Sequence, residues 1–324
     1  MPWPTRASGS AGVTDRGLRG NPVTTPELAV PESRTHRLPA HQSLLRQAAS
    51  RFVRHRAAVF GVVILVLLIV IAVVGPYLTP FAPNNLDLRA IRQPPSYLHP
   101  FGTDTVGYDV FSRFVHGART SLLVGFAAVT VSVSIGTVAG VVGGFYGGIA
   151  DQLLGRLTDT LLSLPPLLLV AIFVAVIGPS VESVVLVISL LTWPRIARLV
   201  RGQVLVLREA EFITSARVVG ADDRSLVIRH ILPNVLGPLS VAASYYMAQA
   251  ILLEAALSFL GLGVRPPAPS WGNMVNQATN ANTLQNLPWI WVPPAVAIAL
   301  VVLAINFIGD GLRDAVDPRA TRRK

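Results

Sequence analysis

Long uncharged apolar runs constrain this chain more than any other feature of its sequence. Residues 57–78 are dominated by Val, Ile and Leu, and several later stretches also exceed the roughly 20 residues that a helix needs to cross a bilayer. A soluble fold has no place for so much continuous apolar surface, whereas in lipid a helix satisfies its own backbone hydrogen bonds. Since 52% of the residues are hydrophobic and only 14% are charged, we predict an all-α polytopic membrane protein.

The predicted molecule has six membrane spans, two of which are irregular. In the third span, Pro165 and Pro166 predict a kink. Only residues 183–194 of the fourth span are free of charge, so its helix has to continue through Arg195 and Arg198, whose side chains can reach the interface. The predicted spans lie at residues 57–78, 121–146, 157–177, 183 to beyond 198, 236–260 and 290–308.

The segments around these spans complete the predicted organisation. Residues 1–45 are rich in Pro, Arg, Ser, Thr and Gly without an apolar period, which is typical of a disordered tail. Residues 46–56 are basic and amphipathic, which suits the headgroup layer of the lipid bilayer. A six-span domain follows at residues 57–320, with outer loops at 79–117 and 264–288, a cytoplasmic loop at 201–234 and a basic C-terminal tail at 321–324.

The distribution of basic residues predicts that both termini are cytoplasmic. Six spans place the two termini on one side, and a cytoplasmic N-terminus puts 22 of the 27 basic residues inside. The five left outside are Arg89, Arg92, Arg113, Arg119 and Arg265. This bias follows the positive-inside rule. It also accounts for the net charge of +10 without nucleic acid, since the sequence has no basic face with interleaved aromatic residues.

The cytoplasmic loop at residues 201–234 is far too long for a simple connection between two spans. Its first part has helical order, because Phe212, Ala216 and Val219 recur at i, i+4 and i+7. Ile213 lies alongside them in this pattern. We therefore predict a short helix with one apolar face.

Gly220 interrupts this pattern and predicts the end of the first short helix. Asp222 is then placed to cap a second helix through Leu232, and Pro233 limits it. The residues alone thus predict two short cytoplasmic helices joined at a glycine. They leave open whether this helix pair binds a partner or rests on lipid.

Four motifs occur along the chain in a recognisable order. They are HPFGTD at 99–104, EFITSARVVGA at 211–221, EAALSFLGLG at 254–263 with PSWG at 269–272, and GDGLRD at 309–314. Together they cover roughly residues 50–320 in order and spacing. They resemble the C-type member of the heterodimeric dipeptide/oligopeptide permeases of bacterial ABC importers. The second motif resembles the EAA loop of these permeases, with Thr214 and Ser215 where glutamate and alanine are usual.

The resemblance implies a type I ABC importer permease fold with cytoplasmic coupling helices in a bacterial inner membrane. It implies three kinds of partner: a second homologous permease that forms a heterodimer with this chain, one or two ATPase subunits that bind ATP and Mg, and an extracytoplasmic solute-binding protein. The loop would insert into a groove of the ATPase and transmit its closure to the spans as rigid-body motion. The implied docking residues are Glu211, Phe212, Ala216, Arg217, Val219, Gly220, Ala221, Asp222 and Pro233.

The chain lacks the residues that an ATPase needs. A phosphate-binding P-loop requires G-x-x-x-x-G-K-[S/T], and the only lysine is Lys324. There is no cysteine, no nucleophile elbow and no Cys/His pair. We therefore predict a non-catalytic translocation subunit without a cofactor of its own. His99, Asp104, Asp109 and His116 share the outer loop, but turn formation and loop packing are favoured over a metal site.

Polar side chains in or near the spans give candidates for contact with substrate. Charged groups are costly in lipid and usually face the interior or a water-filled path, although they also serve as interhelical partners or lie at the interface. The second outer loop is polar, aromatic and almost uncharged, which suits a vestibule that receives substrate or a structural cap. The path candidates are Glu254, Asp159 and Ser258, and the vestibule candidates are Trp271, Asn273 and Asn276.

The expected function is that of a permease subunit that forms half of a path for di- or oligopeptides and couples it to a separate ATPase. One alternative keeps this architecture for nickel or another small solute. A second is an ion-coupled secondary transporter, which is expected to show internal repeats and a charged site at mid-membrane. The sequence shows no clear repeat.

Overall fold

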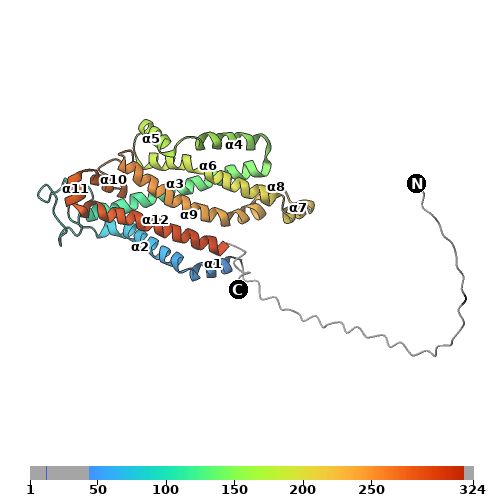
Figure 1. Cartoon of the computed structure of the whole chain (residues 1–324), viewed down its shortest axis with the longest axis horizontal. Coiled ribbons are helices and arrows are strands. Elements are labelled where there is room, and N and C mark those ends of the chain that lie inside the picture. The colour runs from blue at the N-terminus through green and yellow to red at the C-terminus, as the bar shows by residue number, and fades with distance from the viewer. Residues whose placement is uncertain (1–11, 13–43, 317–324) are drawn as a thin grey trace, which may run out of the picture. The chain divides into compact units, whose positions relative to one another are not determined.

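The apolar runs form long helices, as Figure 1 shows. The computed structural model describes residue 12 and residues 44–316, and within these the chain contains no β-strand beyond two isolated bridges. The predicted all-α membrane fold is confirmed. Five helices of this part are long and apolar enough to cross a membrane. They are α2 (Arg56–Leu78), α3 (Val110–Tyr146), α6 (Val181–Arg208), α9 (Leu232–Phe259) and α12 (Pro288–Val316).

The third predicted span, at residues 157–177, is a broken helix pair, which brings the number of candidate spans in the described residues to six if the pair is counted as one. Helix α4 (Gly148–Leu162) and helix α5 (Pro166–Ile177) meet at 92°. The break lies at the predicted proline pair, because Pro165 precedes α5 and Pro166 occupies its first turn, where a missing N–H costs nothing. The kink is therefore confirmed, but the bend is sharper than a kink within one straight span.

The chain before the spans contains helix α1 (Leu44–Arg54), which overlaps residues 46–56, the segment predicted to lie in the headgroup layer. It ends just before α2, where the ring nitrogen Nδ1 of His55 accepts a hydrogen bond of 3.1 Å from the backbone N–H of Ala58. Apart from residues 12, 44 and 45, the predicted N-terminal tail lies outside the described residues. The predicted C-terminal tail lies outside them altogether.

Both predicted outer loops are shorter or more ordered than expected. Helix α3 begins at Val110 rather than near Ser121, because the Asp109 carboxylate caps it and accepts a bond of 2.6 Å from the Ser112 N–H. The first outer loop therefore ends at Asp109. The second is largely helical and contains α10 (Trp271–Asn276), the 3₁₀-helix η2 (Gln277–Thr279) and α11 (Ala281–Asn286).

Helices α3 and α6 pack closely along a row of glycines. A Cβ atom at Gly136 would lie 2.7 Å from the Cβ of Ile196, and one at Gly140 would lie 2.7 Å from the Cβ of Val200. The row continues at Gly144, so both helices meet every fourth residue. Small residues of this kind let membrane helices approach closely. These glycines are therefore the contact points between α3 and α6.

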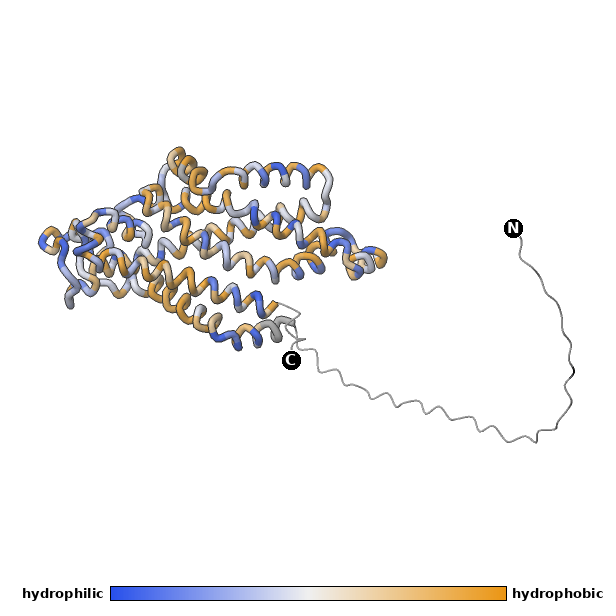
Figure 2. The backbone as a smooth tube through the Cα atoms, viewed as in Figure 1, coloured by the Kyte–Doolittle hydropathy of each residue, from blue (hydrophilic) through white to orange (hydrophobic). Residues whose placement is uncertain are grey.

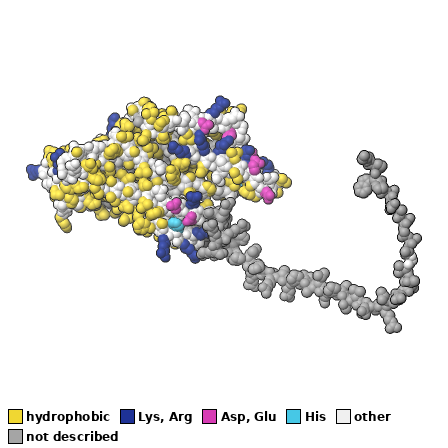
Figure 3. All heavy atoms as spheres, viewed as in Figure 1, with side chains coloured by type: hydrophobic (Ala, Val, Ile, Leu, Met, Phe, Trp, Pro, Cys, Tyr) yellow, Lys and Arg dark blue, Asp and Glu magenta, His cyan; other side chains and the backbone are white. Residues whose placement is uncertain are grey.

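The surface separates apolar and charged regions. Apolar residues dominate the long helices and polar residues gather toward their ends (Figure 2). In Figure 3, most visible Lys and Arg side chains lie toward the end that carries α7 (Glu211–Val218) and α8 (Asp223–Ser225), and we call it the arginine-rich end. The exposed apolar side chains on α2, α3 and α12 are consistent with contact to lipid.

Candidate docking loop and membrane pocket

The segment after α6 forms the predicted short helix and glycine joint. Helix α7 ends in a Schellman motif, in which the Gly220 N–H donates to the Arg217 carbonyl and the Ala221 N–H donates to the Ala216 carbonyl, both at 3.0 Å. Gly220 has a φ of +94°, which favours glycine. The predicted break at Gly220 is confirmed.

The predicted end of the second short helix, at Leu232 before Pro233, is wrong. Helix α8 continues through a π-helical segment, η1 (Leu226–Ile231), into α9, so Pro233 does not stop it. The Leu232 N–H donates to the carbonyl of Val227, five residues back, and this wider turn lets the helix pass a proline that has no N–H. Asp222 occupies the N-cap position, but its side chain makes no capping hydrogen bond.

Helix α7 has one buried and one exposed face. Ile213 is fully buried, and Ala216 packs beside it against apolar residues of α6 and η1. On the other side, Phe212 is 45% exposed, Val218 83% and Val219 88%. The predicted apolar face is thus divided, since Ala216 turns inward and Val218 joins the exposed residues. Exposed apolar side chains at an otherwise polar end are typical of an interaction site.

The polar docking candidates surround this exposed face. Glu211, Arg217 and Asp222 are exposed and make no ion pair with any described residue. A hollow of about 360 Å³ lies beside the glycine joint. Its lining residues are Asp222, Arg224, Ser225, Ile228 and Arg229.

Two path candidates are interior residues that join helices. Glu254 is fully buried, and its carboxylate accepts hydrogen bonds from the hydroxyls of Ser121 at 3.0 Å and Ser258 at 2.9 Å. The Ser270 hydroxyl extends the network to Ser258 at 3.3 Å. This network joins α3, α9 and the start of α10. The structure therefore supports the alternative role, that of interhelical partners, for Glu254 and Ser258.

The third path candidate, Asp159, is exposed and pairs with Arg198 of α6. A second ion pair of the same kind lies nearby, where Nη2 of Arg201 is 2.7 Å from Oδ2 of Asp151. Both pairs connect α4 to α6 near the arginine-rich end. Asp159 is thus an interhelical ion-pair partner.

The vestibule prediction is wrong for Trp271. This side chain is fully buried, stacks on Phe114 and donates from its indole N–H to the Phe114 carbonyl at 3.1 Å. Asn273 completes a capping box with Ser270 at the start of α10. Asn276 donates to the Phe259 carbonyl. The three residues order the loop rather than line an open vestibule.

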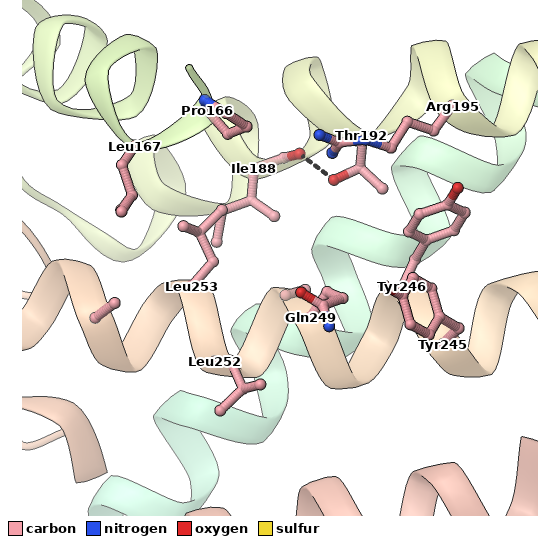
Figure 4. A pocket seen from close by; sticks show the side chains of 12 residues that line it. Pro166, Leu167, Ile188, Thr192, Arg195, Tyr245, Tyr246, Gln249, Leu252 and Leu253 are labelled. Carbon is pink, nitrogen blue, oxygen red and sulfur yellow. Dashed lines mark hydrogen bonds between the residues drawn. The ribbon is translucent and has the colours of Figure 1, made fainter. Parts of the chain in front are cut away.

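A pocket of about 500 Å³ lies between α5, α6 and α9. Figure 4 shows Arg195 and Thr192 of α6 on one side and Tyr245, Tyr246 and Gln249 of α9 on the other. The remaining lining is apolar, from Pro166, Leu167, Ile188, Ala250, Leu252, Leu253 and Ala256. Sequence reasoning missed the α9 residues, although Tyr-Tyr-x-x-Gln is an unusually polar pattern within a span.

Comparison with known proteins finds related transport permeases along most of the chain. Residues 133–322 match the family model described as binding-protein-dependent transport system inner membrane component, and residues 43–95 match the N-terminal transmembrane domain of oligopeptide transport permease C. A Brucella suis protein described as a peptide permease is 47% identical over 283 residues, which are 87% of this chain and 94% of that protein.

A dipeptide transport system permease protein of Alkalihalophilus pseudofirmus is 41% identical over 276 residues, which are 85% of this chain and 90% of that protein. Among solved structures, a chain of the inward-facing methionine ABC transporter MetNI is 22% identical with a TM-score of 0.49. That alignment covers 63% of this chain and 96% of the other.

Proposed function

Because this chain belongs to the family of binding-protein-dependent transport system inner membrane components, we propose that it forms half of the translocation path of a di- or oligopeptide importer. The names of its relatives from Brucella suis and Alkalihalophilus pseudofirmus state peptide and dipeptide transport. The alternatives of nickel import and of an ion-coupled secondary transporter are not favoured. The chain is a non-catalytic membrane subunit.

The exposed apolar face of α7 is the observation that carries the docking part of this proposal. Phe212, Val218 and Val219 lie at the arginine-rich end, where Ile213 anchors the helix to α6 and η1. A partner with an apolar groove would cover this face. The partner is a separate ATPase, which binds ATP and Mg, since this chain's single lysine cannot complete a P-loop.

The other partners follow from the family and from the charge distribution. The arginine-rich end faces the cytoplasm of a bacterium, so both termini are cytoplasmic and α10 and α11 lie outside. A second, homologous permease supplies the other half of the path, and an extracytoplasmic solute-binding protein delivers the peptide. Movement of the ATPases reaches the spans through α7 as rigid-body rearrangement.

Co-purification with the ATPase tests this proposal, using Val219→Asp as the variant and Leu88→Asp as the matched control. Both side chains are well exposed, so neither change disturbs the core. The segments that carry them lie at opposite ends of the helical bundle (Figure 1). The Val219 variant should insert in the membrane and pair with the second permease but lose the ATPase, because a charge would be buried in an apolar contact. ATPase recovery equal to that of the unmodified chain would refute the docking surface.

A further inference from the structure

One arginine of α6 differs from the other three in having no acidic partner. Arg198 pairs with Asp159, Arg201 with Asp151, and Arg208 with Glu209. Arg195 makes no ion pair with any described residue and lines the pocket between α5, α6 and α9. Its charge is therefore available to a ligand in that pocket.

The position of Arg195 along α6 makes this lack of a partner significant. It lies fourteen residues after Val181 and thirteen before Arg208, which is about 20 Å from either end of the helix. It also directly follows the uncharged stretch of residues 183–194, and an ionised side chain beside such a stretch normally faces a cavity or a counter-charge. The pocket supplies the cavity, but none of its lining residues is acidic.

The other polar groups of the pocket suit a small peptide. Tyr245 is exposed and Tyr246 half-buried, and both offer an aromatic face with a hydroxyl, while Gln249 offers an amide donor and acceptor. A volume of about 500 Å³ lies in the usual range of small-molecule sites. A metal cation would find no carboxylate, imidazole or thiolate here.

We propose that Arg195 binds the carboxylate of the transported peptide, while Tyr246 and Gln249 hydrogen-bond its backbone. This inference rests on the proposed function and deepens it, because it assigns a chemical group of the substrate to a residue of the path. The planar guanidinium matches a carboxylate in a bidentate geometry that lysine cannot reproduce.

Uptake by the assembled importer in vesicles tests the role of Arg195. The variants are Arg195→Gln, Arg195→Lys and the matched control Arg198→Gln, which removes one charge of the same helix outside the pocket. Loss of a charged hydrogen bond predicts at least about tenfold slower dipeptide uptake for Arg195→Gln and a smaller loss for Arg195→Lys. Arg198→Gln should stay within about threefold of the unmodified importer, since exposed pairs contribute little.

A labelling experiment identifies the group that Arg195 binds. A photoreactive dipeptide with a free carboxylate should label α6 and α9 of the importer, without binding protein, at least about tenfold more than its C-terminal amide. In Arg195→Gln the two probes should label equally. Equal labelling by both probes in the unmodified importer would overturn the proposal.

Repeating the labelling in vesicles of different lipid composition shows whether the anion that Arg195 binds belongs to the peptide or to a lipid headgroup. The preference for the free carboxylate should persist in vesicles of phosphatidylcholine alone. It should also persist when phosphatidylglycerol is added, and loss of the preference on that addition would assign Arg195 to the lipid headgroup and refute the proposal.

The failures of the two proposals are distinguishable. An unmodified importer that hydrolyses ATP but accumulates no peptide contradicts the proposed function. Peptide accumulation that Arg195→Gln leaves unchanged contradicts only the carboxylate site.

Discussion

The joint at Gly220 should control docking of the ATPase through backbone conformation alone. A Cβ atom at this position would meet nothing within 4 Å, so a substitution causes no clash within the chain. Its φ of +94°, however, is one that residues with a side chain rarely adopt. The effect of a substitution therefore isolates the conformational preference of the Schellman turn.

The expected magnitudes follow the tolerance of each residue for positive φ. Gly220→Ala should cost about 1–2 kcal/mol, which lowers the population of the docking conformation by about 5- to 30-fold. Gly220→Val should cost up to about 3 kcal/mol, because a β-branched residue is least tolerant there. Gly220→Asn should lie closest to the unmodified chain, since asparagine visits left-handed conformations most readily.

Titration of the ATPase onto the purified permease pair measures these differences as changes in Kd. Gly202→Ala is the matched control, because this glycine is also surrounded by open space but lies inside α6, where alanine is favoured. The control should leave Kd unchanged. Equal Kd values for the asparagine and valine variants at Gly220 would refute the conformational reasoning.

Three further outcomes are expected. Gly140→Leu should destabilise the α3–α6 contact by about 1–3 kcal/mol and lower the melting temperature in detergent, whereas Gly155→Leu, with nothing within 4 Å, should not; equal melting temperatures would contradict the close packing. Glu254→Ala should lower the free energy of unfolding by about 1–3 kcal/mol for each hydroxyl left unpaired, and the melting temperature with it, while Glu254→Gln should lose less; an alanine variant with an unchanged melting temperature would contradict the buried network. Because the chain has no cysteine, Val219→Cys should react with an impermeant maleimide only from the cytoplasmic side and Tyr97→Cys only from outside; the reverse pattern would invert the proposed orientation.

The sequence was sufficient for features that depend on local chemistry. Apolar run length located the spans, the proline pair located the bend between α4 and α5, and Gly220 marked the end of α7. Each of these follows from hydropathy or from the backbone preference of one residue type.

Features that depend on packing were not predictable from the sequence. Pro233 reads as a helix stop, but the π-helical turn before it carries the helix onward. Trp271 reads as a surface aromatic, but it stacks on Phe114 within the core. Arg195 reads as a snorkelling side chain, and only the arrangement of α5, α6 and α9 places it in a pocket.

The continuous helix from Asp223 to Phe259 fixes the rotation of the pocket residues on α9 relative to α7, which precedes this helix in the chain. Because no joint interrupts it, the rotational setting of Tyr246 and Gln249 is locked to that of the docking loop. Deleting one residue between Leu232 and Tyr245 would turn the pocket face by about 100° relative to α7, whereas removing seven would restore the setting within about 20°. The number of residues in this stretch, more than their identity, therefore decides whether a movement of α7 turns the pocket residues in the correct direction.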